Sequence, residues 1–243
     1  MSIITEIQHR SHPHQLKLLP VDTPYCCYGC KIEGQEPCYQ CTDCGFYLHE
    51  ECSSGSPTFH PFFKKSKFRF YDNSKDQRHV GFCAACGKSV KGFRYHALFK
   101  KAPVFLHPCC LKLKTEIKDE GAMVNLMLCK KLSWPSKCLK CKRRKLSEEV
   151  RGWAYVSTCG YYNYHVGCVQ ELILEKWREA YFRQQSGGET LSTGSLVVEH
   201  GGLTGIMRAR GLSSSKIQGI LKLIITAIFG EGISVIIKLV SGT

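Results

Sequence analysis

The stretch CTDCGFYLHEEC, residues 41–52, decides the fold of this chain because it gathers three cysteines and one histidine in twelve residues. It begins with a Cys-x2-Cys pair and ends with a His-x2-Cys pair. The His-x2-Cys ending recurs at His107–Cys110 and His165–Cys168, but no cysteine pair stands directly before it there. The chain therefore contains a repeat whose first copy carries additional side chains.

The composition favours metal binding over disulfide formation. The 243 residues include 16 cysteines and 10 histidines, and residues 1–14 lack the apolar region of a secretory signal. Cysteines of a chain that stays in a reducing compartment bind metal more often than they pair. We expect an intracellular protein, cytoplasmic or nuclear and not secreted, with peripheral attachment to endomembranes as an option. A disulfide framework is the alternative.

Three further cysteine pairs keep register with the His-x2-Cys endings. They begin 56 and 55 residues apart, and the endings begin 58 residues apart in both cases. Each repeat thus offers three thiolates and one imidazole, which is enough for a closed tetrahedral zinc site. Zinc would supply roughly 10–16 kcal/mol of folding free energy per site to units too small to fold well alone. The three pairs are Cys27–Cys30, Cys83–Cys86 and Cys138–Cys141.

Only the first repeat has ligands for a second ion. Its additional candidates are His14, Cys41, Cys44 and His60. The equivalent positions are Phe70, Ala97, Lys100 and Lys118 in the second repeat, and Asn125, Ser157, Gly160 and Lys176 in the third. We therefore expect four Zn²⁺ ions, distributed as two, one and one.

The eight-ligand string of the first repeat resembles the C1 zinc finger of the phorbol-ester and diacylglycerol type, with a histidine as the last ligand. It is more similar to the divergent C1 (DC1) domains of plant Cys/His-rich proteins. The phrases that carry this resemblance are HPHQLKLL, CGFYLHEEC, GFRYHALFKKAPVFLHPCC and GWAYVSTCGYYNYHVGC, which span about residues 9–180.

The resemblance implies an interleaved ligand arrangement and a role as an interaction module in signalling. One ion is expected on Cys27, Cys30, His49 and Cys52, and a second on His14, Cys41, Cys44 and His60. The third and fourth are expected on Cys83, Cys86, His107 and Cys110, and on Cys138, Cys141, His165 and Cys168. Diacylglycerol binding is not expected, because the second loop, residues 31–40, is short and offers only Ile32 as an apolar tip.

The expected fold class is a small zinc-stabilised α+β protein built from three tandem C1-like zinc-finger units with short sheets and a short helix each. The stretch HVGCVQELILEKWREAY, residues 165–181, has the apolar periodicity of a helix. The predicted segments are 9–62, 63–118 and 124–184 for the units, 185–215 for a Gly/Ser-rich linker, and 216–243 for an apolar helical tail.

A PHD-type histone reader is the rival interpretation of residues 27–52. Such a finger would borrow Cys83–Cys86 as its last pair, leaving His14 and His60 without a role. It also prefers a tryptophan where this chain has Gly81. A histone-tail or nucleic-acid reader in the nucleus is therefore kept as the alternative function.

Several cysteines and histidines lack ligand spacing. The five spare cysteines are interpreted as small buried residues, and the five spare histidines as surface or capping residues. These are Cys26, Cys38, Cys109, Cys129 and Cys159, and His9, His12, His79, His96 and His200.

The charge and the tail bear on partners. A formal net charge of +14 favours anionic partners, and the basic run at residues 137–145 fits either phosphate contact or a solvated loop.

The tail is interrupted by Lys222, Glu231 and Lys238, and its apolar pieces are short for a membrane span. It fits packing into a protein partner, homo-oligomerisation or a membrane interface, with a true span as the last option.

No catalytic motif occurs in the sequence, so we do not expect an enzyme. The function expected is a zinc-binding interaction or adaptor protein, attached to its own copies or to an anionic membrane surface through the tail and the basic patches.

Overall fold

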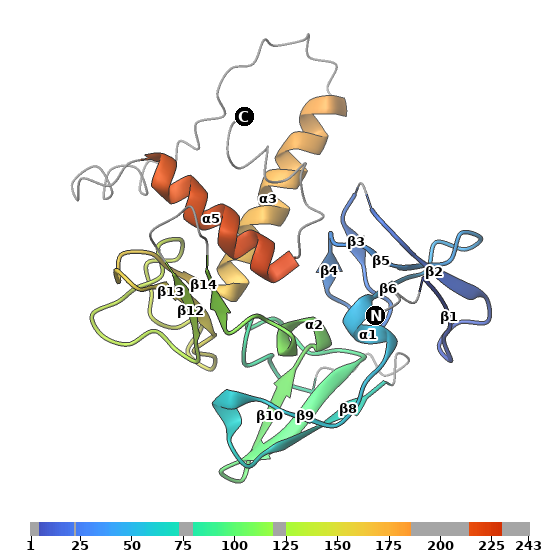
Figure 1. Ribbon diagram of the computed structural model, residues 1–243, viewed down its shortest axis with the longest axis horizontal. Coiled ribbons are helices and arrows are strands. Elements are labelled where there is room, and N and C mark those ends of the chain that lie inside the picture. The colour runs from blue at the N-terminus through green and yellow to red at the C-terminus, as the bar shows by residue number, and fades with distance from the viewer. Residues whose placement is uncertain (1–4, 22, 73–79, 119–124, 186–213, 230–243) are drawn as a thin grey trace. The chain divides into compact units, whose positions relative to one another are not determined.

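The computed structural model describes residues 5–21, 23–72, 80–118, 125–185 and 214–229. The chain divides into two compact units, Met1–Leu113 and Lys114–Thr243, each of which is described by itself. Among the described residues, the first unit contains two four-stranded sheets and a two-stranded hairpin, and the second contains one four-stranded sheet (Figure 1).

The first sheet is antiparallel with the strand order β1-β2-β5-β6. A separate two-stranded hairpin, β3-β4, lies in the chain between β2 and β5, and the short helix α1 (Glu50–Ser53) follows β6 directly. The strands are β1 (Glu6–Gln8), β2 (Gln15–Leu19), β3 (Tyr25–Cys26), β4 (Glu33–Gly34), β5 (Cys38–Gln40) and β6 (Tyr47–His49).

The second sheet, also antiparallel, has the order β10-β9-β8-β7. A 3-10 helix, η1 (Pro61–Phe63), connects β7 to β8, and the short helix α2 (Pro108–Leu111) follows β10. Its first strand lies inside the segment 9–62 that was predicted as the first unit, so the second sheet begins before residue 63. The strands are β7 (Thr58–Phe59), β8 (Lys67–Tyr71), β9 (Arg94–Phe99) and β10 (Ala102–Leu106).

The sheet of the second unit has the order β11-β12-β13-β14, so each of the three large sheets joins its strands in chain order. The helix α3 (Val166–Gln185) begins at the end of β14, as the sequence pattern predicted, and buries Val169 and Ile173. The strands are β11 (Glu116–Ile117), β12 (Leu126–Cys129), β13 (Ala154–Ser157) and β14 (Asn163–His165).

Helix α5 (Ser214–Phe229) contacts α3 and β11 and buries Ile220, Ile224 and Ile225. It covers the beginning of the predicted tail, whereas residues 230–243 of the tail and 186–213 of the linker lie outside the described residues. Within the described part of the chain, no helix has both the length and the apolarity needed to cross a bilayer.

The two sheets of the first unit share a core. Phe93, which precedes β9 of the second sheet, is fully buried in the hydrophobic cluster of the first, beside Leu16 and Leu48. Its backbone N–H donates to the carbonyl oxygen of Gly29 at 2.8 Å. Gly92 has φ +68°, and a Cβ there would lie 2.1 Å from that same oxygen. Only glycine allows this approach.

Gly92→Ala is therefore expected to destabilise the first unit more than Gly45→Ala, which serves as the matched control. Both alanines enter the left-handed region, at a cost of about 1–2 kcal/mol, but nothing lies within 4 Å of a Cβ at Gly45. The clash at Gly92 adds about 1–3 kcal/mol. Thermal and urea unfolding of the two variants measures the difference, and equal loss in both would contradict the close approach.

Candidate metal centres

Four groups of cysteine and histidine side chains have the size of a zinc site. In each group, one ligand atom from each of four residues lies within 4.8 Å of the others. Zn–S bonds of about 2.3 Å and Zn–N bonds of about 2.0 Å place tetrahedral ligand atoms roughly 3.3–3.8 Å apart. The groups are Cys27/Cys30/His49/Cys52, Cys83/Cys86/His107/Cys110, Cys138/Cys141/His165/Cys168 and His12/His14/Cys41/Cys44.

The three Cys3His groups share one construction. In each, the histidine ends the last strand or directly precedes the short helix, and the final cysteine lies in the first turn of the helix that follows. The histidine Nδ1 lies 3.3–3.4 Å from the second cysteine sulfur of the Cys-x2-Cys pair and 3.8–3.9 Å from the helix cysteine. The predicted ligands of these groups are therefore brought together as the sequence indicated.

Each of these histidines uses its outer nitrogen to fix the ring. Nε2 of His107 lies 3.2 Å from the carbonyl oxygen of Ser89, and Nε2 of His165 lies 3.4 Å from that of Arg144. Because a carbonyl only accepts, the proton is on Nε2 and Nδ1 is available for metal.

The first group differs because its histidine faces a carboxylate. His49 Nε2 lies 3.2 Å from Glu36 Oε1. Glu36 is held in turn by the Gln35 N–H, which donates to Oε2 at 2.9 Å, and by the Tyr25 hydroxyl at 3.4 Å from Oε1. A carboxylate partner raises the basicity of a metal-binding imidazole. Sequence reasoning missed Glu36, because its position depends on the β3-β4 hairpin.

Burial makes these groups dependent on a cation. Burial raises the pKa of the Cys30 and Cys52 thiols well above the ordinary value. Burial alone would also raise the pKa of Cys27, but hydrogen bonds from Cys30 and Cys52 and the charge of His49 bring it well below that value. Three thiolates cannot be buried together without a compensating charge, which Zn²⁺ supplies.

The fourth group corrects one predicted ligand. His14 Nδ1 lies 3.5 Å from the Cys41 sulfur and 3.4 Å from the Cys44 sulfur, as expected, but the fourth side chain is His12. His12 Nε2 lies 3.1 Å from the Cys44 sulfur, and its ring stacks on Phe46. His12 had been interpreted as a surface or capping residue. The signal was the His-x-His spacing, because the bend at Pro13 and His14 brings the two rings together, with their centroids 5.1 Å apart.

His60 lies in the second sheet instead. It follows β7, which pairs with β8 and so takes the chain away from the first sheet. Its Nδ1 accepts a hydrogen bond from the Phe62 N–H at 3.2 Å, and the buried ring begins η1. His60 is thus a capping residue in the structure, the role that the sequence had assigned to His12.

The other two sheets replace the second metal group in different ways. In the second sheet, Phe63 packs edge to face against Phe68 and Phe99, with ring centroids 5.4 and 5.3 Å apart. In the third sheet, Asn163 Nδ2 donates to the Gly160 carbonyl at 3.0 Å, and Ser157 accepts from the Tyr162 N–H at 3.0 Å. An aromatic cluster and a hydrogen-bonded turn therefore stand where the first sheet has ligands.

The five spare cysteines do not share one environment. Cys38 is buried, and burial raises the pKa of its thiol to about 12. Cys26 and Cys159 are exposed, while Cys109 and Cys129 are partly buried, so the expectation of five small buried residues holds for Cys38 alone.

Cys83 and Cys86 group with His107 and Cys110 and not with the first repeat. The ligand sharing that a PHD-type finger would require is therefore not seen among the described residues.

Residues 10–53 match the C1 domain family. This chain contains a C1-like zinc-finger domain. No curated protein and no solved structure gives a significant match. C1 domains bind zinc and typically mediate ligand or protein binding, and the four Cys/His groups fit zinc in number and kind of donor. The C1-like domain at residues 10–53, with the four Cys/His groups, thus indicates a zinc-binding regulatory or interaction module.

The histidine exchange in the fourth group has a direct test. Wild-type protein is expected to hold four zinc ions after dialysis against a mild chelator. His12→Ala should hold three, because two cysteines and one histidine leave that site incomplete, whereas His60→Ala should keep four. Elemental analysis gives the count, and the opposite pattern would return His60 to the metal site.

Glu36→Ala is expected to weaken one of the four zinc sites by about 10–100-fold, because the His49 ring loses the carboxylate that orients it. Zinc transfer to a colorimetric chelator should then show one fast ion and three slow ions. Glu6→Ala, on the edge strand β1, is the matched control. Four ions released at the wild-type rate would show that Glu36 has no effect on the metal.

Proposed function

We propose that this protein is a zinc-organised adaptor, without enzymatic activity of its own, that holds a protein partner in an intracellular signalling assembly. The observation that carries the proposal is that each metal group has four protein ligands. Four ligands complete the tetrahedral coordination of zinc, which is the arrangement of structural and not of catalytic sites.

In this proposal the zinc ions have a structural role, because they hold each finger in shape and so make its surface available to a partner. The described strands are two to six residues long, and strands this short need support from outside the sheet. The Cys-x2-Cys and His-x2-Cys pairs supply that support, so the outward-facing side chains of each finger are available for binding.

The second unit displays the side chains expected of a partner surface. Trp134 is 80% exposed and Tyr161 is 50% exposed. Tryptophan and tyrosine are enriched among the residues that dominate binding energy at protein interfaces. Trp134 precedes the basic run at residues 137–145, which favours a partner with acidic groups beside an apolar pocket.

The tail is assigned to attachment or self-association. The described part of it, α5, buries Ile220, Ile224 and Ile225 within the second unit and leaves Lys222 exposed. We propose that residues 230–243, whose sequence is equally apolar, provide contact with a second copy or with a membrane surface. Removing these residues should leave zinc content unchanged and lower the oligomeric state or the membrane-associated fraction.

The partner surface is tested by proximity labelling in cells with the full chain. Trp134→Ala should remove specific proteins from the labelled set, because a large exposed contact is lost, while the zinc count stays at four. Met127→Ala, which truncates another exposed apolar side chain of the same unit, is the matched control. A binary assay with each purified candidate then measures a loss of affinity, expected to exceed about tenfold.

Two outcomes would contradict the adaptor. An unchanged set of labelled proteins in Trp134→Ala would remove the proposed partner surface. A labelled set that disappears after nuclease treatment would instead favour the alternative of a nucleic-acid reader.

A further inference from the structure

The second finger is strongly basic. Residues 57–113 contain twelve lysines and arginines against two acidic residues, Asp72 and Asp76. Part of this charge offsets the three thiolates of the Cys83 group. Most of the remainder lies on the sheet β7–β10 and its turns, where five lysines stand at one end.

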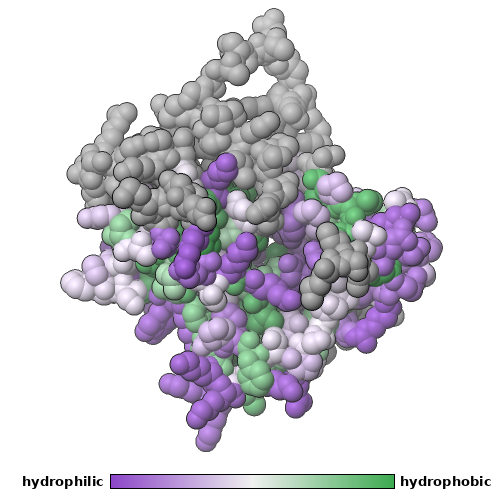
Figure 2. Space-filling view, in the orientation of Figure 1, coloured by the Kyte–Doolittle hydropathy of each residue, from purple (hydrophilic) through white to green (hydrophobic). Residues whose placement is uncertain are grey.

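These five lysines and two apolar side chains form one surface, which we name the lysine tip. Its members come from the η1–β8 connection, from the β9–β10 turn and from the adjoining strand positions, and all seven are exposed. They are Lys64, Lys65, Lys67, Lys100, Lys101, Phe59 and Leu98. Figure 2 shows hydrophilic side chains gathered at the end of this sheet, with hydrophobic ones beside them.

The strand register places the apolar side chains between the lysines. Phe59 lies opposite Lys67. Arg69 lies opposite His96, so Lys67 comes opposite Leu98 two residues further along. Residues opposite each other in an antiparallel sheet point to the same face. Phe59, Lys67 and Leu98 therefore form a row across three strands, with Phe59 65% and Leu98 64% exposed.

The two turns hold their lysines in a conformation that disfavours them. Lys100 and Lys101 have φ values of 52° and 65°, and Lys65 has φ 69°. Lys100 and Lys101 connect β9 to β10. Because Phe99 pairs with Ala102, these two lysines form a two-residue hairpin loop. Such loops with two positive φ values strongly favour Asn-Gly. Lysine at both positions lowers stability and adds two charges at the tip, which indicates a use for the side chains.

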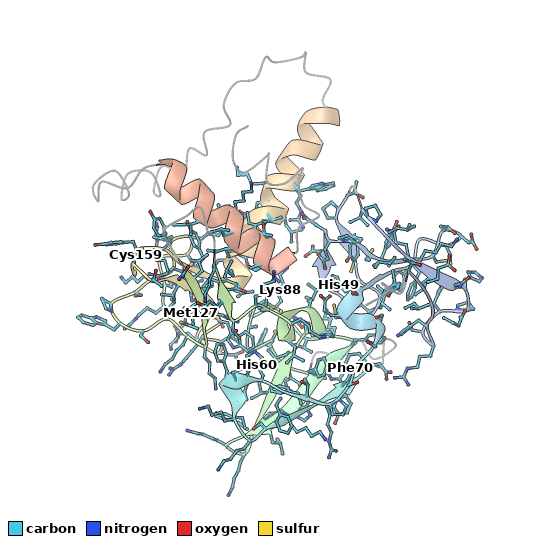
Figure 3. All side chains as sticks on the ribbon, viewed as in Figure 1. His49, His60, Phe70, Lys88, Met127 and Cys159 are labelled. Atoms are coloured by element: carbon cyan, nitrogen blue, oxygen red, sulfur yellow. The ribbon has the colours of Figure 1, made fainter. Side chains whose placement is uncertain are left out.

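A hydrogen bond and an aromatic cluster hold the backbone of the lysine tip in place. Ser66 between Lys65 and Lys67 donates its hydroxyl to the Leu98 carbonyl at 2.8 Å, which joins the first turn to β9. The cluster of Phe63, Phe68 and Phe99 fills the position at which the first sheet has its His12/His14/Cys41/Cys44 group. The sticks in Figure 3 show long side chains extending from this end of the sheet, below the labelled His60.

We propose that the lysine tip docks on a bilayer surface that contains anionic phospholipids. The lysine ammonium groups would contact lipid phosphates, and Phe59 and Leu98 would enter the boundary between headgroups and acyl chains. The tip itself contains five lysines and no acidic residue, which matches a surface of uniform negative charge. It consists of residues other than Trp134 and the tail, so it goes beyond the proposed function.

A bilayer fits this surface better than a single-stranded nucleic acid. Successive bases need several aromatic faces on which to stack, and the tip offers a single exposed aromatic ring, Phe59, beside the aliphatic Leu98. On the neighbouring part of the sheet, the His96 ring stacks on Phe105 at 4.9 Å. Arg94 lies 5.6 Å over the Tyr71 ring. Compact lysine charges beside aliphatic surface are typical of interfacial membrane binding.

The test is flotation of the zinc-loaded full chain with phosphatidylcholine vesicles that do or do not contain phosphatidylserine. Wild-type protein should float with the anionic vesicles only, and added salt should release it. Lys100→Asn/Lys101→Gly should reduce the partition coefficient by roughly 25-fold, from about fivefold per lysine. Because Asn-Gly suits this turn, the variant should unfold at the same or a higher temperature, which separates lost binding from lost folding.

Lys112→Gln/Lys114→Gln is the matched control, because it removes the same charge from exposed positions outside the tip. Leu98→Ser tests insertion and should weaken flotation without changing the zinc count. The inference is overturned if wild-type protein does not float, or if the Asn-Gly variant floats as well as wild type. It is also overturned if only deletion of residues 230–243 abolishes flotation, or if the tip lysines are required for an oligonucleotide and not for vesicles.

Discussion

The mutual repulsion of buried thiolates is the constraint on which this structure depends. Cys27, Cys30 and Cys52 are completely or almost completely buried around His49. Without a cation, the Cys30 and Cys52 thiols keep their protons, because burial raises the pKa of both well above the ordinary value. Zinc removes this conflict, and the sheets, which are too short to be stable alone, form around the ions.

The same end of the sheet is completed by three kinds of physical interaction in the three repeats. The first uses metal ligands, the second an aromatic cluster around Phe63, and the third the hydrogen bonds of Ser157 and Asn163. A metal group at this end requires the turn to supply ligands. An aromatic cluster needs no ligands from the turn, so the β9–β10 turn of the second sheet can contain residues that do not bind metal. Lys100 and Lys101 occupy it.

The sequence predicted what depends on local spacing and missed what depends on chain path. Cys-x2-Cys and His-x2-Cys pairs present their ligands wherever a tight turn or a helix start occurs, so the three Cys3His groups could be assigned residue by residue. His60 is close to these ligands in sequence, but β7 belongs to the next sheet and takes it away. Glu36 and Phe93 reach their positions through a hairpin and a shared core, and neither leaves a periodic pattern.

The shared core links the two Cys3His groups of the first unit. Phe93 lies in the second finger, between the candidate ligands Cys86 and His107, yet it is buried with Leu16 and Leu48 of the first. Gly92 lets the two backbones touch, and Lys88 adds an ion pair with Glu33 at 3.3 Å. Zinc at one group orders the finger that completes the core of the other. Any energetic coupling that this shared core carries between the two groups must be reciprocal.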